Sequence, residues 1–158
     1  MEIRKASTDP HIIFAKTYES KSLEEIKLIK PKWAYGDNVG ELYDYIQNPK
    51  NNEYTIFIVN TLELIKNAEF GEVDISILFT GDINNNYRIA RILSRWENCE
   101  FVDPPCIGID STEKNRIVFT DGRHRTKLTY LLGHRQMPVA VSNLEIKEIS
   151  KIIKLIEK

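Results

Sequence analysis

The sequence predicts an α+β fold in which a small mixed sheet is flanked by helices. The chain of 158 residues fits a single domain, residues 1–158, with a core of its own. Hydrophobic residues make up 42% of it and charged residues 28%, as is ordinary for a soluble globular protein. Short β-rich runs alternate with segments of helical periodicity, and we find no internal repeat or low-complexity linker.

The N-terminal part begins with helix signals. Ser22 and Glu25 have the spacing of a capping box, which predicts a helix that Pro31 stops. A short apolar run, residues 11–15, precedes it. Residues 40–47 predict a second short helix, ended by an Asn-Pro pair.

Strand signals follow, and residues 54–59 are the strongest strand in the first half. The apolar residues of 61–67 fit either periodicity, and we favour a helix there. Residues 73–79 alternate well enough to predict a strand, and residues 81–86 predict a loop. Residues 1–80 suggest no activity, so we describe them as an N-terminal elaboration of unknown role.

The second half carries the remaining predicted elements. Residues 87–96 predict an amphipathic helix, and its inner stripe consists of Ile89, Ile92, Leu93 and Trp96. We expect strands near residues 106–109, 117–119 and 137–141. Residues 144–157 predict a C-terminal helix whose isoleucines share one face, for core packing or for dimerisation.

The most informative segment is residues 120–125, which read Thr-Asp-Gly-Arg-His-Arg. A β-rich run leads into the Asp-Gly turn, and leucines at helical spacing follow until Gly133. A glycine turn that opens a helix leaves backbone N–H groups at the positive end of the helix dipole, which favours a bound phosphate or other anion. The alternative is a surface turn whose cations cap neighbouring carbonyls.

These residues, together with a Leu-Gly pair and the Met-Pro-Val-Ala-Val strand after the helix, resemble the core of the ParB/sulfiredoxin-like superfamily. The resemblance covers roughly residues 86–142, because the preceding helix and the strand entered by Pro104 and Pro105 also fit. It implies a site for ATP or CTP, commonly with Mg²⁺, and members hydrolyse the nucleotide, transfer phosphate or have been described as nucleases.

Carried over by position, the resemblance implies that Gly122 allows close backbone approach and that Arg123, His124 and Arg125 contact phosphates. Thr126 would add a hydroxyl contact. Asp121 adjoins this anion site and is our preferred ligand for Mg²⁺, which favours one or two carboxylates plus phosphate oxygens. His124 would donate to phosphate or act as an acid or base. The candidate catalytic residues are therefore His124 and Asp121.

The branch of the superfamily stays open. The sulfiredoxin branch has its catalytic Cys where this chain has Arg123, which argues against sulfinic-acid reduction. The partition-protein branch has a Glu in the motif and a DNA-reading helical domain after it, and this chain has neither. The loop is also similar to the Asp-Gly-Gln-Gln-Arg loop of restriction-type NTPases.

Charge and cysteine content limit the expected partners. The net charge of −1 gives no overall positive field, so any nucleic-acid contact must be local. Arg88, Arg91 and Arg95 share a helix face, which is a phosphate-binding wall, a narrow nucleic-acid track or a solvated face. Cys99 and Cys106 match no metal or redox pattern and are expected to be buried thiols. No segment predicts a membrane span or a leader, so a cytoplasmic setting is expected.

Three functions follow from the sequence. The first is a protein that binds a nucleoside triphosphate and hydrolyses it or transfers its phosphate. The second is a non-catalytic interaction or regulatory factor of a plasmid, phage or defence system, acting on a protein partner. The third is a ParB-like nuclease that uses the arginine face as its track.

Overall fold

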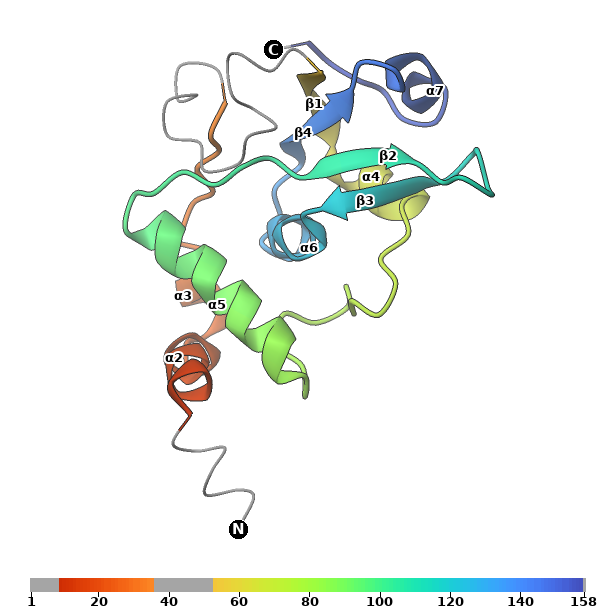
Figure 1. Ribbon diagram of the computed structural model, residues 1–158. Helices are drawn as coiled ribbons and strands as arrows, with labels where there is room; N and C mark the ends of the chain where they lie inside the picture. The colour runs from red at the N-terminus through yellow and green to blue at the C-terminus, as the bar shows by residue number, and fades with distance from the viewer. Residues whose placement is uncertain (1–8, 36–52, 158) are drawn as a thin grey trace.

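The computed structural model describes residues 9–35 and 53–157. Its helices are α2 (Pro10–Glu19), α3 (Leu23–Ile26), α4 (Thr61–Asn67), α5 (Ile83–Glu97), α6 (Arg123–Leu131) and α7 (Ile146–Ser150) (Figure 1). Its strands are β1 (Tyr54–Asn60), β2 (Cys106–Ile109), β3 (Ile117–Asp121) and β4 (Gln136–Ser142). None of these helices is both long enough and apolar enough to cross a bilayer.

The four strands form one mixed sheet in the order β1-β4-β2-β3. β1 and β4 pair antiparallel from Tyr54 opposite Ser142 to Asn60 opposite Gln136. β4 and β2 are parallel, and β2 and β3 form an antiparallel hairpin. The predicted α+β class with a small mixed sheet is therefore confirmed. Because β1 pairs along its whole length, the first half of the chain supplies an edge of the sheet as well as an elaboration.

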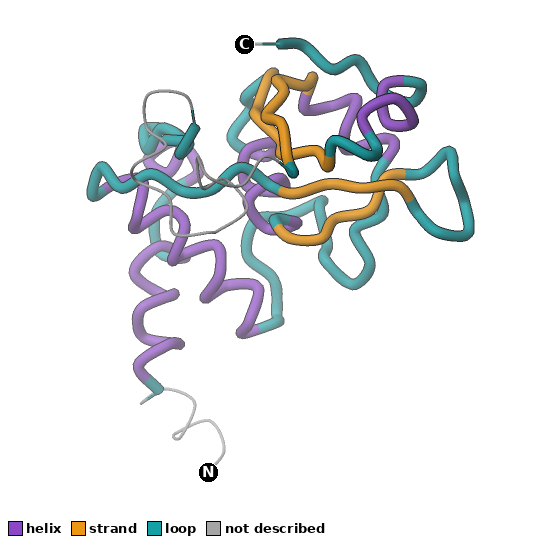
Figure 2. Tube along the Cα trace, turned by 45° about the horizontal axis from the view of Figure 1, so that its top comes forward, coloured by secondary structure: helices purple, strands orange, loops and turns teal. Residues whose placement is uncertain are grey.

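The strands gather at one end of the molecule, and α2 and α5 lie at the other (Figure 2). One core cluster joins α2, α3 and α5 around the buried side chains of Ile89, Leu93 and Trp96. A second cluster fills the space between the sheet, α4 and α7. Helix α6 lies between the sheet and α5 in Figure 1, and it contributes Leu128 to the first cluster. Helix α6 therefore joins the two ends of the molecule.

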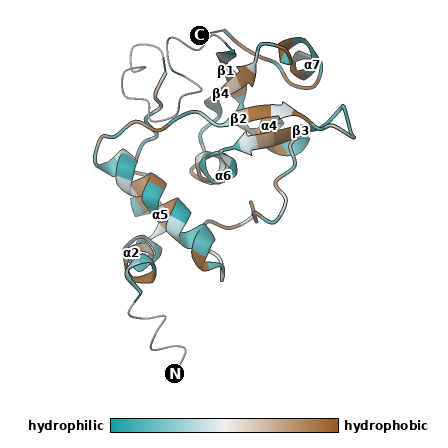
Figure 3. Ribbon diagram, in the orientation of Figure 1, coloured by the Kyte–Doolittle hydropathy of each residue, from teal (hydrophilic) through white to brown (hydrophobic). Residues whose placement is uncertain are grey.

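Helix α5 has the two faces that its sequence predicts. Figure 3 shows hydrophobic and hydrophilic residues side by side along its turns. Ile89, Leu93 and Trp96 are fully buried, whereas Ile92 is only half-buried. Helix α5 begins at Ile83, so the last four residues of the loop predicted over 81–86 are helical. The reason is the side chain of Asp82, which accepts a hydrogen bond from the backbone N–H of Asn84 at 2.9 Å and caps the helix.

Several local predictions are confirmed. Residues 61–67 form α4, and the strands predicted near 54–59, 106–109, 117–119 and 137–141 are all present. The capping box has both arms, because Glu25 N–H donates to Ser22 Oγ at 3.2 Å and Ser22 N–H donates to Glu25 Oε1 at 3.0 Å. Helix α3 nevertheless ends at Ile26, well before Pro31. The apolar run 11–15 is part of α2.

The strand predicted over 73–79 is wrong. These residues form turns and bends in the loop between α4 and α5. The side chain of Asp74 accepts hydrogen bonds from the backbone N–H and the hydroxyl of Ser76, at 2.9 and 2.6 Å, which stabilises a turn. The alternating sequence pattern of residues 73–79 therefore does not produce a strand, because no neighbouring strand in the described part of the chain pairs with this segment. The helix predicted over 40–47 lies outside the described residues.

The long C-terminal helix predicted over 144–157 is also wrong. Only Ile146–Ser150 is helical, and the chain then turns back to the edge of β1. Ile58 N–H donates to Ile156 O at 2.8 Å, and Ile156 N–H donates to Ile58 O at 2.9 Å. Pairing with an exposed strand edge satisfies backbone groups that a longer helix would leave open.

Candidate functional site

A cleft of about 690 Å³ lies where the outer face of α5, the start of α6 and the loop over residues 71–82 meet. Its volume is in the range of small-molecule sites. The turn at residues 120–125 forms one wall. Arg88, Arg91 and Arg95 of α5 form a second wall. The structure thus brings the arginine face beside the glycine turn, although the two are far apart in sequence.

Gly122 opens α6, as the sequence predicts, and it has a φ of +103°. A Cβ at this position would lie 2.5 Å from Pro105 Cβ and 2.7 Å from Pro105 Cα. Glycine is therefore needed both for its backbone conformation and for the close approach of the chain entering β2. No side chain caps α6, so its positive end is available to the cleft.

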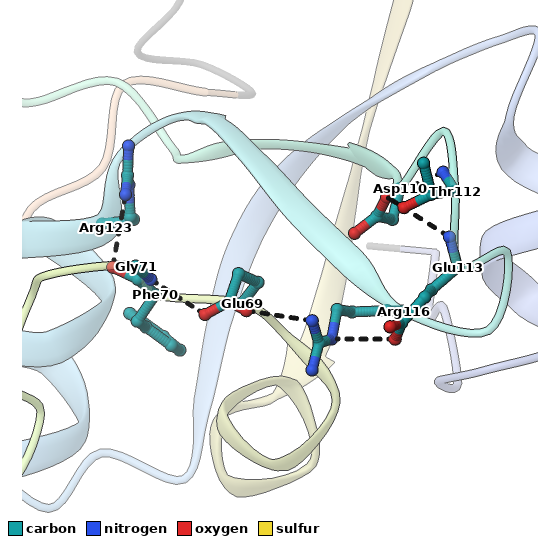
Figure 4. A network of polar contacts seen from close by, with 8 residues as sticks. All are labelled: Glu69, Phe70, Gly71, Asp110, Thr112, Glu113, Arg116 and Arg123. Carbon is teal, nitrogen blue, oxygen red and sulfur yellow. Dashed lines mark hydrogen bonds and ion pairs between the residues drawn. The ribbon is translucent and has the colours of Figure 1, made fainter.

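Arg123 is exposed, and its side chain reaches the backbone just before the loop over residues 71–82. Its Nη1 donates to the backbone oxygen of Phe70 at 3.2 Å (Figure 4). Gly71, with a φ of +59°, makes room for it, since a Cβ there would lie 2.7 Å from Arg123 Nη1. The loop is held from the other side by the ion pair between Glu69 and Arg116 at 2.9 Å. Arg123 therefore positions the loop and faces the cleft at once.

Arg125 is less exposed, with 18% of its side chain accessible. Its Nη2 lies 3.3 Å from Oδ2 of Asp121, the last residue of β3, and 57% of the Asp121 side chain is accessible. The Nε of Arg125 is buried without a hydrogen-bond partner in the described part of the protein. The pair brings the candidate metal ligand and a candidate phosphate ligand together at the mouth of α6.

His124 lines the cleft and is half-buried. Its pKa is lowered from 6.5 to about 4, first by burial and then by the nearby cations Arg88, Lys127 and Arg123. Asp82 acts in the opposite direction. His124 is therefore a neutral ring at pH 7, with one N–H to donate and one nitrogen to accept.

Thr126 does not line the cleft, contrary to its expected role. It is fully buried, and its hydroxyl donates to the backbone oxygen of Gly122 at 2.9 Å. A threonine in a helix commonly bonds back to the carbonyl one turn earlier. Its role here is structural, because it stabilises the first turn of α6.

Sequence reasoning missed a buried polar network behind the cleft. Lys127 is fully buried, and its Nζ donates to Asn85 Oδ1 at 2.7 Å. Asn85 Nδ2 donates to Asn86 Oδ1 at 2.9 Å, and Asn86 holds Thr80 through two hydrogen bonds of 2.8 Å. The network ties α6 to the start of α5 and to the loop wall. The sequence contains one signal for the position of Lys127. Lys127 lies three residues after His124, on the same helix face, and directly precedes Leu128.

Three further aspartates and the two cysteines fall in several places. Asp82 and Asp103 line the cleft, whereas Asp110 caps the turn between β2 and β3 by accepting hydrogen bonds from Thr112. Cys106 is buried as expected, but Cys99 is exposed. No group of three or more His, Cys, Asp or Glu residues capable of holding a metal is found in the described ranges. A metal at Asp121 would therefore take its remaining ligands from phosphate and water.

The cleft is mixed in charge. Its five arginines face five carboxylates: Glu72, Asp74, Asp82, Asp103 and Asp121. Three of these carboxylates, Glu72, Asp74 and Asp82, belong to the loop wall. Such a surface suits a compact anion held at one end of the cleft better than a long polyanionic strand, which would pass the carboxylates.

No protein-family model matches this sequence, and no curated protein or solved structure is significantly similar to it. The resemblance to the ParB/sulfiredoxin-like superfamily is therefore an expectation from the sequence motif at residues 120–125 and its flanking segments.

Proposed function

We propose that this protein binds a nucleoside triphosphate, ATP or CTP, in the cleft. The observation that carries the proposal is the meeting of the uncapped start of α6 with the arginine face of α5. Backbone N–H groups at the helix start, together with Arg123 and Arg125, would bind the triphosphate. Arg88 would complete the site from the opposite wall.

The order of elements supports the family resemblance. Helix α5, the hairpin β2–β3, helix α6 and strand β4 follow one another as the resemblance implies for residues 86–142. Gly122 lies at the start of α6. We therefore propose a ParB/sulfiredoxin-like core that includes this segment.

Turnover of the nucleotide would require Mg²⁺ and a side chain that acts as a general acid or base. Asp121 would hold the metal against the phosphates, where a cation stabilises the charge of the transferring phosphoryl group. His124 would donate to the phosphates and is the candidate acid or base. A pKa of about 4 makes the free ring a weak base at neutral pH, and Asp121 is paired with Arg125. These two observations favour the second candidate, a non-catalytic interaction or regulatory factor that acts on a protein partner.

Calorimetric titration with ATP, CTP and GTP, with and without Mg²⁺, tests the proposal. Arg88→Ala should weaken binding of the preferred nucleotide by about tenfold or more, because it removes a charged donor to phosphate. Arg135→Ala is the matched control, since Arg135 is exposed and does not line the cleft. Unchanged affinity in Arg88→Ala would disprove this site. Release of phosphate would indicate the enzyme, and binding without release of phosphate would indicate the regulatory factor. Cleavage of a nucleic-acid strand would indicate the nuclease.

A further inference from the structure

One corner of the cleft concentrates positive charge around a neutral ring. His124 and Arg123 project from the first turn of α6, and Arg88 faces them from α5. Lys127 lies behind His124 on the same helix face, fully buried and bonded to Asn85. The one opposing charge on His124 from the described elements packed around it comes from Asp82, at the start of α5.

The positive charges of this corner favour a bound anion, because Asp82 alone opposes the three cations around His124 in the described residues. Burial and the three cations hold His124 neutral, since a fourth positive charge would be repelled there. A multiply charged anion against Arg88 and Arg123 reverses the local field. It also accepts a hydrogen bond from a ring N–H of a protonated histidine, and such charge-assisted bonds are the stronger ones.

We infer that His124 takes up a proton from solvent when a phosphate group occupies this corner, so that ligand binding and protonation of the ring are coupled. The inference rests on the proposed function, and it identifies the ligand's end as a group with two or more negative charges. The ring nitrogen gains the proton, and no other bond forms or breaks. Binding should therefore tighten as the pH falls below about 6 toward 4, where the free ring is protonated.

The chain offers a direct measurement because it has three histidines. His11 stacks on Tyr87 with ring centroids 4.2 Å apart, and His134 has a pKa lowered by burial and by Lys30, outside the cleft. NMR titration of the imidazole signals between about pH 3.5 and pH 8, with and without metal-free tripolyphosphate, covers the free-state pKa of His124 and resolves each ring. We expect the His124 pKa to rise by one unit or more on binding, while that of His134 stays lowered as in the free protein.

The second measurement is the pH dependence of affinity, with sulfate as a probe that remains a dianion throughout. A rise of one pKa unit makes the protonated form bind about tenfold more tightly, and His124→Gln should abolish this dependence. Arg135→Ala should keep it. Binding without a shift at His124 would overturn the inference and leave the proposed function standing. A folded protein that binds neither tripolyphosphate nor any nucleotide would overturn the proposed function itself.

Discussion

The two arginines of the turn have different surroundings, and we expect both to matter for affinity. Arg123 bonds to Phe70 O and Arg125 pairs with Asp121, yet each retains guanidinium donors that face the cleft. Arg123→Ala and Arg125→Ala should each weaken triphosphate binding by about 1.5–3 kcal/mol, the range for a lost hydrogen bond to a charged group. Calorimetry with the triphosphate and the monophosphate checks this, and the loss should be smaller for the monophosphate. If neither arginine affects any nucleotide, the turn is a capped surface turn.

Asp121→Asn separates metal binding from turn formation. The substitution removes the charge and keeps a side chain that suits the turn. Metal-free binding should change little, because an exposed ion pair such as that with Arg125 contributes about 0–1 kcal/mol. Any Mg²⁺-dependent part of the affinity should fall, as titration with and without the metal would measure. An equal loss in both conditions would make Asp121 a structural turn residue.

Lys127 should influence His124 although it does not line the cleft. Lys127→Met removes a buried cation and keeps an unbranched side chain. The pKa of His124 should then rise toward its usual value of 6.5, because one of the three charges that lower it is gone. NMR titration of the ring measures the change. The same pKa in the variant and the parent would show that Lys127 does not act on His124.

At the scale of elements, the start of α6 depends on Gly122, and the structure changes what its substitution tests. The sequence suggests that Gly122→Val would abolish binding at modest cost to stability. The contact with Pro105 contradicts the modest cost to stability, because any Cβ at Gly122 collides with the chain entering β2. Loss of binding in such a variant would not separate a blocked ligand from a damaged fold.

Two glycines allow a matched comparison. Gly122 has a φ of +103°, and Gly133 has a φ of +85° with open space where a Cβ would lie. Gly133→Ala should cost about 1–3 kcal/mol from backbone strain alone. Gly122→Ala should cost about 1–3 kcal/mol more, because overpacking against Pro105 is added. Urea denaturation of both variants measures the difference, and equal losses would argue against the close approach.

For the whole molecule, the lowered pKa of His124 predicts how stability depends on pH. The unfolded chain protonates this ring near pH 6.5, while the folded protein does so only near pH 4. Between these values the unfolded state binds more protons, so the free energy of unfolding falls as the pH is lowered from 6.5 to 4. His134 acts in the same direction.

Urea denaturation at several pH values, with and without His124→Gln, isolates the contribution of this ring. The variant should lose less stability than the parent over this range. A parent and a variant with parallel pH profiles would show that His124 is protonated equally in the folded and unfolded states.

The amino-acid sequence was sufficient for the features that depend on neighbouring residues. The capping box at Ser22, the glycine turn at Gly122 and the strand, helix and strand around it all follow from local backbone preferences. The cationic motif at residues 120–125 was likewise visible, since Arg123, His124 and Arg125 are consecutive in the sequence.

Which distant segments meet is a property of the folded chain. The fold brings the arginine face of α5 to the turn, buries Lys127 against Asn85 and directs Thr126 inward, and none of these contacts has a local signature. It also leaves residues 73–79 without a strand partner and gives Ile156 one in β1. The physical reason is that pairing and burial depend on residues far away in the chain, whereas helix caps and turns depend on the next few.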